Sequence, residues 1–175
     1  FLEQYQIYEL ILEKKKVTKL IGSPDRKARL YDTDSSGNQL LIVSNHSDKA
    51  NYRPYIYNRT TKQLSKALTK KGFGIAGAKI DWKKGRLFVT KSKNNATSDL
   101  YEVNMRTRKA TLLHKRPGTS YSPSYILGDK LYINTSHKRD RYGCAYIDIN
   151  HPKKINWIRY DKTRDLFCSY DKEKN

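Results

Sequence analysis

The sequence predicts an all-β fold built from repeated four-stranded units, because a glycine turn and a tyrosine strand both recur and the composition suits strands. A turn that contains Gly is followed three times by an alternating strand, and Leu40, Leu87 and Leu131 of these strands are 47 and 44 residues apart. The 175 residues include 14 Tyr but only 4 Phe and 1 Met. Such a composition favours short strands over a helical bundle.

The strands of one unit follow in a fixed order. The strand before each glycine turn is expected at Ala28–Asp32, Ile75–Trp82 and Ser122–Ile126. After the strand that follows the turn comes a polar loop and then a tyrosine strand, whose markers are spaced by 44 and 45 residues: Tyr57, Tyr101 and Tyr146. The closing strands are expected at Leu64–Leu68, Ala110–Leu113 and Ile155–Ile158.

Four strands that recur at about 45 residues are typical of the blades of a β-propeller. One small twisted sheet cannot bury both of its faces alone, and the neighbouring blades cover them. The alternative is a generic antiparallel meander or sandwich. The regular spacing favours a β-propeller of four-stranded antiparallel blades.

The repeat divides the chain into about three and a half blades of a partial ring, all within one propeller domain. The predicted parts are 1–22 (second half of a blade), 23–71, 72–117 and 118–162 (one blade each) and 163–175 (first strand of a further blade). Two half-blades would leave unpaired edges, so we expect the chain to be part of a larger propeller. A closed four-bladed ring is the alternative.

The repeat resembles that of TolB-like (WD40-like, PD40) propellers. Pro123, Gly128, Leu131 and Ser136 fit this pattern in the third unit, and Ile56-Tyr57, Leu68-Thr69 and Leu100-Tyr101 fit it in the first two. The Ser-Pro-Asp-Gly core of the family is altered in all three units, for example to Asp-Ser-Ser-Gly at residues 34–37. The family includes TolB, envelope proteins with a peptidoglycan-binding domain, and the propellers of prolyl-oligopeptidase-type peptidases. The resemblance implies binding or gating rather than chemistry.

The formal net charge is +19, from 36 Lys and Arg against 17 Asp and Glu. A field of this size attracts nucleic acid, anionic lipid or an acidic protein. The basic residues are dispersed, with short runs at Lys14–Lys16 and Lys70–Lys71. A solvated lysine-rich surface therefore explains them as well as a binding patch does.

No catalytic constellation stands out, so we predict neither an enzymatic activity nor a cofactor. The G-x-S-x-G motif of serine hydrolases is missing. The four histidines, His46, His114, His137 and His151, form no H-x-x-x-H pair. Each is interpreted as a solvated histidine in a loop or at a strand end.

The best candidates for partner contact lie in the polar loops between strands. They combine Arg and Tyr, the residue types that most often anchor interfaces, with basic neighbours. The candidate residues are Tyr52, Arg53, His137, Lys138, Arg139, Arg141 and Tyr142. A solvated loop is the alternative for each of them.

A calcium-like turn begins the first full unit, where Asp32, Asp34 and Ser36 precede Gly37. Alternate oxygen side chains of this kind can wrap a hard cation. The twelfth position is Val43, however, where an EF-hand has Glu. The same residues also suit a metal-free turn between strands.

Two cysteines, Cys144 and Cys168, lie outside any C-x-x-C motif, so zinc and thioredoxin sites are unsupported. A disulfide is one interpretation, but we expect two small buried thiols.

The sequence therefore predicts a non-catalytic TolB-like propeller that acts as a protein-interaction or scaffold module in a bacterial envelope assembly. We expect a periplasmic or cell-envelope location from the resemblance, with the cytoplasm as the alternative. No apolar run reaches 18 residues, so no membrane-spanning segment is expected. One alternative function is the propeller domain of a prolyl-oligopeptidase-type serine peptidase. Another is a basic propeller that binds nucleic acid or an anionic surface.

Overall fold

The computed structural model describes residues 5–70, 74–94 and 96–170, where all regular secondary structure is β. Three sheets have four strands each and a fourth sheet has two. The predicted class, all-β with four-stranded antiparallel sheets, is confirmed. The chain divides into two compact units, residues 1–75 and 76–175, which are described separately.

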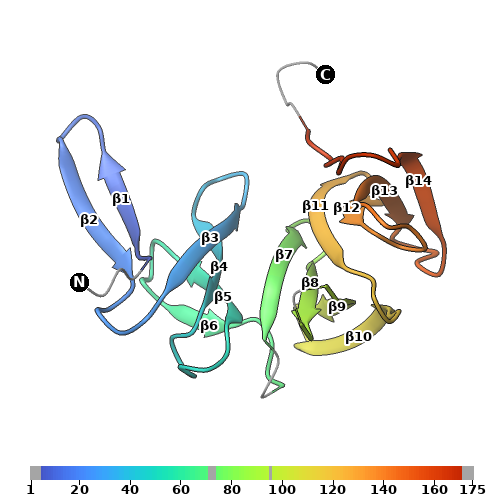
Figure 1. Ribbon diagram of the computed structural model, residues 1–175. Coiled ribbons are helices and arrows are strands. Elements are labelled where there is room, and N and C mark those ends of the chain that lie inside the picture. Colours follow the sequence, from blue (N-terminus) through green and yellow to red (C-terminus); the bar gives the residue numbers. More distant parts are fainter. Residues whose placement is uncertain (1–4, 71–73, 95, 171–175) are drawn as a thin grey trace. The chain divides into compact units, whose positions relative to one another are not determined.

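The first unit contains a hairpin and one four-stranded sheet (Figure 1). The hairpin consists of β1 (Ile7–Ile11) and β2 (Lys16–Ile21). The sheet consists, in spatial order, of β3 (Ala28–Thr33), β4 (Gln39–Ser44), β5 (Arg53–Asn58) and β6 (Leu64–Lys66).

The hairpin and the sheet of the first unit share a core. Ile7 and Ile21 of the hairpin cluster with Leu40, Ile42 and Tyr57 of the sheet, and all five are buried. Burial of each aliphatic side chain contributes about 1.5–3 kcal/mol. The hairpin is therefore held by apolar packing as well as by the backbone.

The second unit contains two four-stranded sheets. The first is formed by β7 (Ile75–Asp81), β8 (Arg86–Ser92), β9 (Ser98–Asn104) and β10 (Lys109–His114). The second is formed by β11 (Tyr121–Leu127), β12 (Lys130–Thr135), β13 (Gly143–Asp148) and β14 (Ile155–Arg159). Strand β11 packs against β8 and β9, so the two sheets lie face to face as neighbouring blades do.

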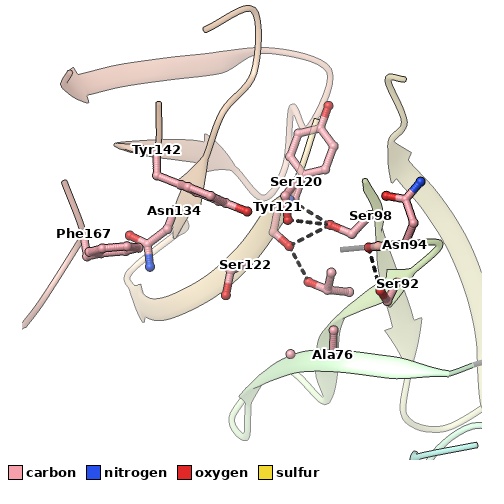
Figure 2. Close-up of a pocket in the computed structure, with 12 residues that line it drawn as sticks. Ala76, Ser92, Asn94, Ser98, Ser120, Tyr121, Ser122, Asn134, Tyr142 and Phe167 are labelled. Atoms are coloured by element: carbon pink, nitrogen blue, oxygen red, sulfur yellow. Dashed lines mark hydrogen bonds between the residues drawn. The ribbon is translucent and has the colours of Figure 1, made fainter. Parts of the chain in front are cut away.

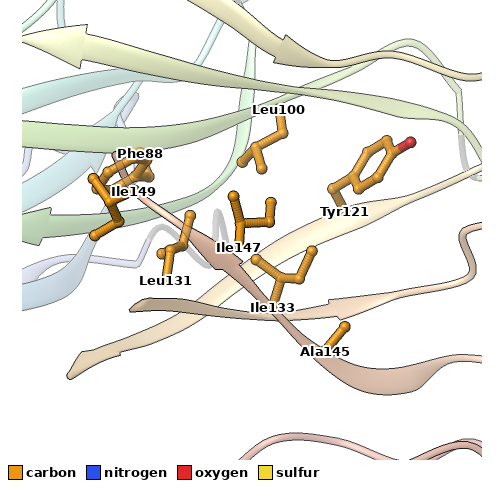
Figure 3. Packing of buried hydrophobic residues seen from close by; sticks show 8 residues of the cluster. All are labelled: Phe88, Leu100, Tyr121, Leu131, Ile133, Ala145, Ile147 and Ile149. Carbon is orange, nitrogen blue, oxygen red and sulfur yellow. The ribbon is translucent and has the colours of Figure 1, made fainter. Parts of the chain in front are cut away.

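The core of the second unit follows from the period-two alternation of β12 and β13. Leu131 and Ile133 are buried on one face of β12 and pair with Ile147 and Ala145 of β13. Figure 3 shows these side chains gathered with Phe88 and Leu100 of the facing sheet. This apolar layer joins the two sheets.

The opposite face of the second sheet carries tyrosines. The rings of Tyr125 and Tyr132 stack with centroids 4.3 Å apart, and Tyr146 lies 6.0 Å from Tyr132. Tyr170, from beyond the last strand, stacks on Tyr125 at 5.3 Å. Tyr146, one of the tyrosines that mark the repeat, thus belongs to a row of tyrosines on the face opposite the core, whereas Tyr57 is buried in the core of the first unit.

The glycine turns have the conformation for which glycine is suited. Gly37, Gly85 and Gly128 have φ of 69°, 61° and 57°, in the left-handed region that residues with a Cβ rarely adopt. These turns set the register of the strands that follow.

One expected strand differs. The sequence predicts the first strand of a further blade within 163–175, of which residues 171–175 lie outside the described part of the chain. Residues 163–170 form no strand. The segment instead lies along the second sheet, where Leu166 donates its backbone N–H to the Tyr142 carbonyl at 2.9 Å. Among the described residues no helix is long and apolar enough to cross a membrane.

Candidate functional site

Two of the predicted contact residues belong to the first unit. Tyr52 is half-buried and accepts a backbone hydrogen bond from Ile75 at 3.0 Å. Arg53 is not a loop residue as expected: it begins β5 and is only 6% exposed. Its guanidinium forms an ion pair with Asp48 at 3.6 Å. This pairing offsets part of the cost of burying the Arg53 charge. Arg53 is therefore turned inward and not toward solvent.

The other five predicted residues lie in the loop between β12 and β13, as the sequence indicated. Three basic side chains of this loop, Lys138, Arg139 and Arg141, are exposed, whereas His137 and Tyr142 are half-buried. A turn closed by a hydrogen bond from the Arg139 N–H to the Ser136 carbonyl (3.0 Å) shapes the loop. The structure brings these residues together in one place of the second unit.

Arg139 rests on two aromatic rings of β14 and the residues after it. Its guanidinium carbon lies 5.7 Å from the Trp157 centroid and 4.9 Å from the Tyr160 centroid. The two rings meet edge to face at 5.8 Å. Gly143 makes room for the indole, because a Cβ at this position would lie 2.6 Å from Cζ3 of Trp157. We call Lys138, Arg139, Arg141, Trp157 and Tyr160 the Arg139 surface.

His137 faces inward toward a second histidine. Its Nδ1 lies 3.0 Å from the Tyr121 hydroxyl, and His114 Nε2 lies 2.6 Å from the Pro152 carbonyl. The ring centroids of His114 and His137 are 6.4 Å apart. Burial lowers the pKa of both histidines, and the positive charges of Arg116 and Lys138 lower that of His137 further. These two are therefore packed histidines and not the solvated ones expected.

A hollow of about 440 Å³ lies at the ends of the strands of the second unit (Figure 2). Hydrogen bonds to the Tyr121 backbone fix one side of the hollow. The Tyr121 carbonyl accepts from the Thr90 hydroxyl at 2.7 Å, and the Tyr121 N–H donates to the Ser98 hydroxyl at 2.9 Å. Ser122 lines the same side. Tyr142 extends toward it from the β12–β13 loop in Figure 2.

The segment 165–168, here called the strap, supplies the remaining wall of the hollow. Phe167 lines it and stacks with Tyr142 at 6.0 Å. The Cys168 N–H donates to Asn134 Oδ1 at 2.6 Å, and Asp165 Oδ1 accepts the Tyr142 N–H at 2.8 Å. Two pocket residues are thus held by the strap.

A disulfide between Cys144 and Cys168 fastens the strap to β13. The expectation of two separate thiols was wrong. The two Cα atoms lie 5.1 Å apart, within the range that a disulfide spans. The cysteines are 24 positions apart in the sequence, and no local signal indicates this pairing, since β14 and the chain reversal after it bring them together.

The calcium-like turn is closed by its own hydrogen bonds. Asp34 accepts the Ser36 hydroxyl at 2.7 Å and the Gln39 N–H at 3.0 Å. The bonds from Gln39 and Ser36 hold the pKa of the half-buried Asp34 carboxyl below its usual value. Asp32 accepts the Thr33 N–H at 3.0 Å. In the described residues no group of three or more His, Cys, Asp or Glu is placed to hold a metal, and calcium at this turn stays a prediction.

Sequence reasoning missed Trp157, Tyr160 and Phe167, and it missed the hydroxyl groups of the hollow. Their residue types are ordinary for strands and loops, and no spacing links them. The short segment Trp157–Tyr160, with an exposed Arg159 between the two rings, is the one local signal that could have drawn attention to this side of the blade.

Comparison with known proteins shows likeness of fold. No protein-family model and no curated protein matches the sequence. Among solved structures, TolB from Acinetobacter baumannii aligns with a TM-score of 0.63 and 12% identity, over 85% of this chain and 36% of TolB. A puromycin-hydrolyzing peptidase from Mycobacterium tuberculosis also aligns with a TM-score of 0.63 and 12% identity, over 82% of this chain and 22% of the peptidase. Oligogalacturonate lyase from Vibrio parahaemolyticus aligns at 0.59 and 14%, over 90% of this chain and 48% of the lyase.

These likenesses support a β-propeller fold of the kind found in TolB and in prolyl-oligopeptidase-type peptidases. The chain spans about a third of TolB and less than a quarter of the puromycin-hydrolyzing peptidase. This chain therefore shares a fold with parts of these proteins, and a shared fold does not by itself indicate a shared activity.

Proposed function

We propose that this chain is a non-catalytic propeller module that binds an acidic protein segment through the Arg139 surface, within a bacterial envelope assembly. One observation carries the proposal: Arg139 is exposed, yet it rests on Trp157 and Tyr160. Stacking holds the planar guanidinium in place while its N–H groups remain available for a carboxylate.

Three features support an acidic partner. Arg139 forms no ion pair with any described residue. Lys138 and Arg141 flank it in the same exposed loop. The net charge of +19 would also steer an acidic segment toward the chain and speed its association. The likeness of fold to TolB supports the envelope assignment and a periplasmic location.

The test measures binding of a fluorescent Asp- and Glu-rich peptide to the full chain by anisotropy. Arg139→Lys keeps the charge but loses the planar fork, so we expect about fivefold weaker binding. Arg106→Lys, at an exposed arginine of the β9–β10 turn, is the matched control and should leave the affinity unchanged. Unchanged affinity in both variants would reduce the interaction to net charge, and equal losses in both would show that Arg139 is not special; either result would contradict the proposal.

The second candidate is the propeller domain of a prolyl-oligopeptidase-type peptidase. It is favoured by the puromycin-hydrolyzing and prolyl peptidases that share the fold, of which this chain spans 22–34%. Sequencing the complete open reading frame that encodes this chain tests the second candidate. An α/β-hydrolase region with G-x-S-x-G in the same frame supports this candidate, and a frame without one removes it.

A further inference from the structure

The hollow of the second unit is uncharged, in contrast to the chain as a whole. Asp, Glu, Lys and Arg make up 30% of the residues, but none of the 12 residues that line the hollow is one of them. An ion would find no countercharge among these residues. The lining therefore suits a neutral ligand.

Three polar groups of the lining are available for a ligand. The Ser122 hydroxyl, the Tyr142 hydroxyl and the amide nitrogen of Asn134 make no hydrogen bond within the described part of the chain. Thr90 and Ser98, by contrast, are committed to the Tyr121 backbone. Hydroxyls both donate and accept and the amide nitrogen donates, which matches a ligand that carries several hydroxyl groups.

An exposed aromatic ring lies beside these groups. Phe167 is 66% exposed, and its ring plane is within 28° of that of Tyr142. The face of an aromatic ring is electron-rich, so it attracts the polarised C–H groups of a sugar ring. The Cys168 N–H bond to Asn134 and the disulfide keep Phe167 close to the polar groups.

We propose that the hollow binds a neutral sugar, with one pyranose ring against Phe167 and its hydroxyl groups on Ser122, Tyr142 and Asn134. The volume of about 440 Å³ lies within the range of small-molecule sites, roughly 300–1,000 Å³. This site is separate from the Arg139 surface, since the two share no residue.

The proposal is tested by an NMR titration of the ¹⁵N-labelled full chain with cellotriose and chitotriose, both uncharged. We expect saturable shifts at residues of the hollow with at least one of them, at low and at high salt alike, because a neutral ligand is not screened. Tetraglycine is the neutral peptide probe. Binding of tetraglycine without either sugar, or no shift with either sugar, would overturn the proposal.

Two variants locate the site. Phe167→Ala removes the exposed ring and should weaken sugar binding about tenfold. Ser122→Ala removes one hydroxyl and should weaken it about threefold. Ser169→Ala, at an exposed serine outside the hollow, and Arg139→Ala should leave it unchanged. Sugar binding that survives both Phe167→Ala and Ser122→Ala would show that the hollow is not the site, whatever happens at the Arg139 surface.

Discussion

At the scale of single residues, the most informative group is the pair His114 and His137 beside Tyr121. The packing that buries them also sets their charge state, because burial disfavours the protonated ring. Both have a pKa below the ordinary value of 6.5. Tyr121, buried in the same cluster, has its pKa raised to about 12 by the same cause. The cluster is therefore neutral near pH 7.

The lowered pKa values of His114 and His137 predict that the folded chain loses stability in mild acid. The unfolded chain, with histidine pKa near 6.5, binds more protons than the folded chain once the pH falls below that value, so folding is disfavoured there. Because the rings are only partly buried, we expect a modest fall in Tm, roughly 2–4 °C, between pH 7.5 and 5.5. Differential scanning fluorimetry measures it.

The variant that checks the cause is His137→Asn, which keeps an acceptor for the Tyr121 hydroxyl but does not titrate. It should reduce the dependence of Tm on pH in this window. His151→Asn, at an exposed histidine, is the control and should retain the full dependence. Asp25 and Asp161 do not disturb this measurement. The pKa of each is lowered from 3.8 to about 2, so their protonation affects stability only below about pH 4. An unchanged pH profile in His137→Asn would contradict the assignment.

At the scale of elements, the strap shows how a segment without strand structure can be ordered. It has three kinds of attachment: the disulfide, backbone and side-chain hydrogen bonds to Tyr142 and Asn134, and the stacking of Phe167. Ser124 adds a hydrogen bond to the Cys168 carbonyl at 2.9 Å. The strap thereby forms one wall of the hollow and holds two of its lining residues, Asn134 and Tyr142.

Loss of the disulfide should destabilise the second unit. A cross-link that closes a loop of 24 residues restricts the unfolded chain and is worth about 3 kcal/mol. We expect Cys168→Ser to lower the free energy of unfolding by about this amount in urea titrations. Dithiothreitol should have the same effect on the native chain and none on Cys168→Ser. Equal stability of the native and reduced chains would refute the role given to the disulfide.

The glycine turns illustrate the opposite case at the same scale, because they were predictable. Gly37, Gly85 and Gly128 stood at equivalent places in the repeat, and each has positive φ in the structure. A turn depends on a few consecutive residues. The strands on either side, with their alternation of buried and exposed residues, follow from equally local information.

At the scale of the whole molecule, the charge of +19 predicts an attraction to nucleic acid that is electrostatic alone. Affinity for duplex DNA should fall on the order of a thousandfold between 50 and 200 mM salt, because counterion release dominates such binding. Anisotropy with two unrelated 20-base-pair duplexes, a length of roughly two helical turns, measures it, and both should respond alike.

The comparison of the two duplexes separates charge from recognition. If one duplex stayed bound at 200 mM salt while the other dissociated, the chain would recognise sequence, and the nucleic-acid alternative would gain over the acidic protein partner. The same salt series leaves the neutral sugar site unaffected, so sugar binding can be told apart from the two electrostatic interactions under the same conditions.

The sequence by itself determined the all-β class, the repeat of four strands and the loop that carries His137, Lys138, Arg139, Arg141 and Tyr142. These features depend on alternation, turn residues and spacing, which act over a few residues or recur at a fixed period. Only the tertiary structure decided the inward turn of Arg53, the pairing of Cys144 with Cys168 and the wall formed by Phe167. Each of these depends on burial, or on residues that chain reversals bring together, and no local pattern encodes which partners will meet.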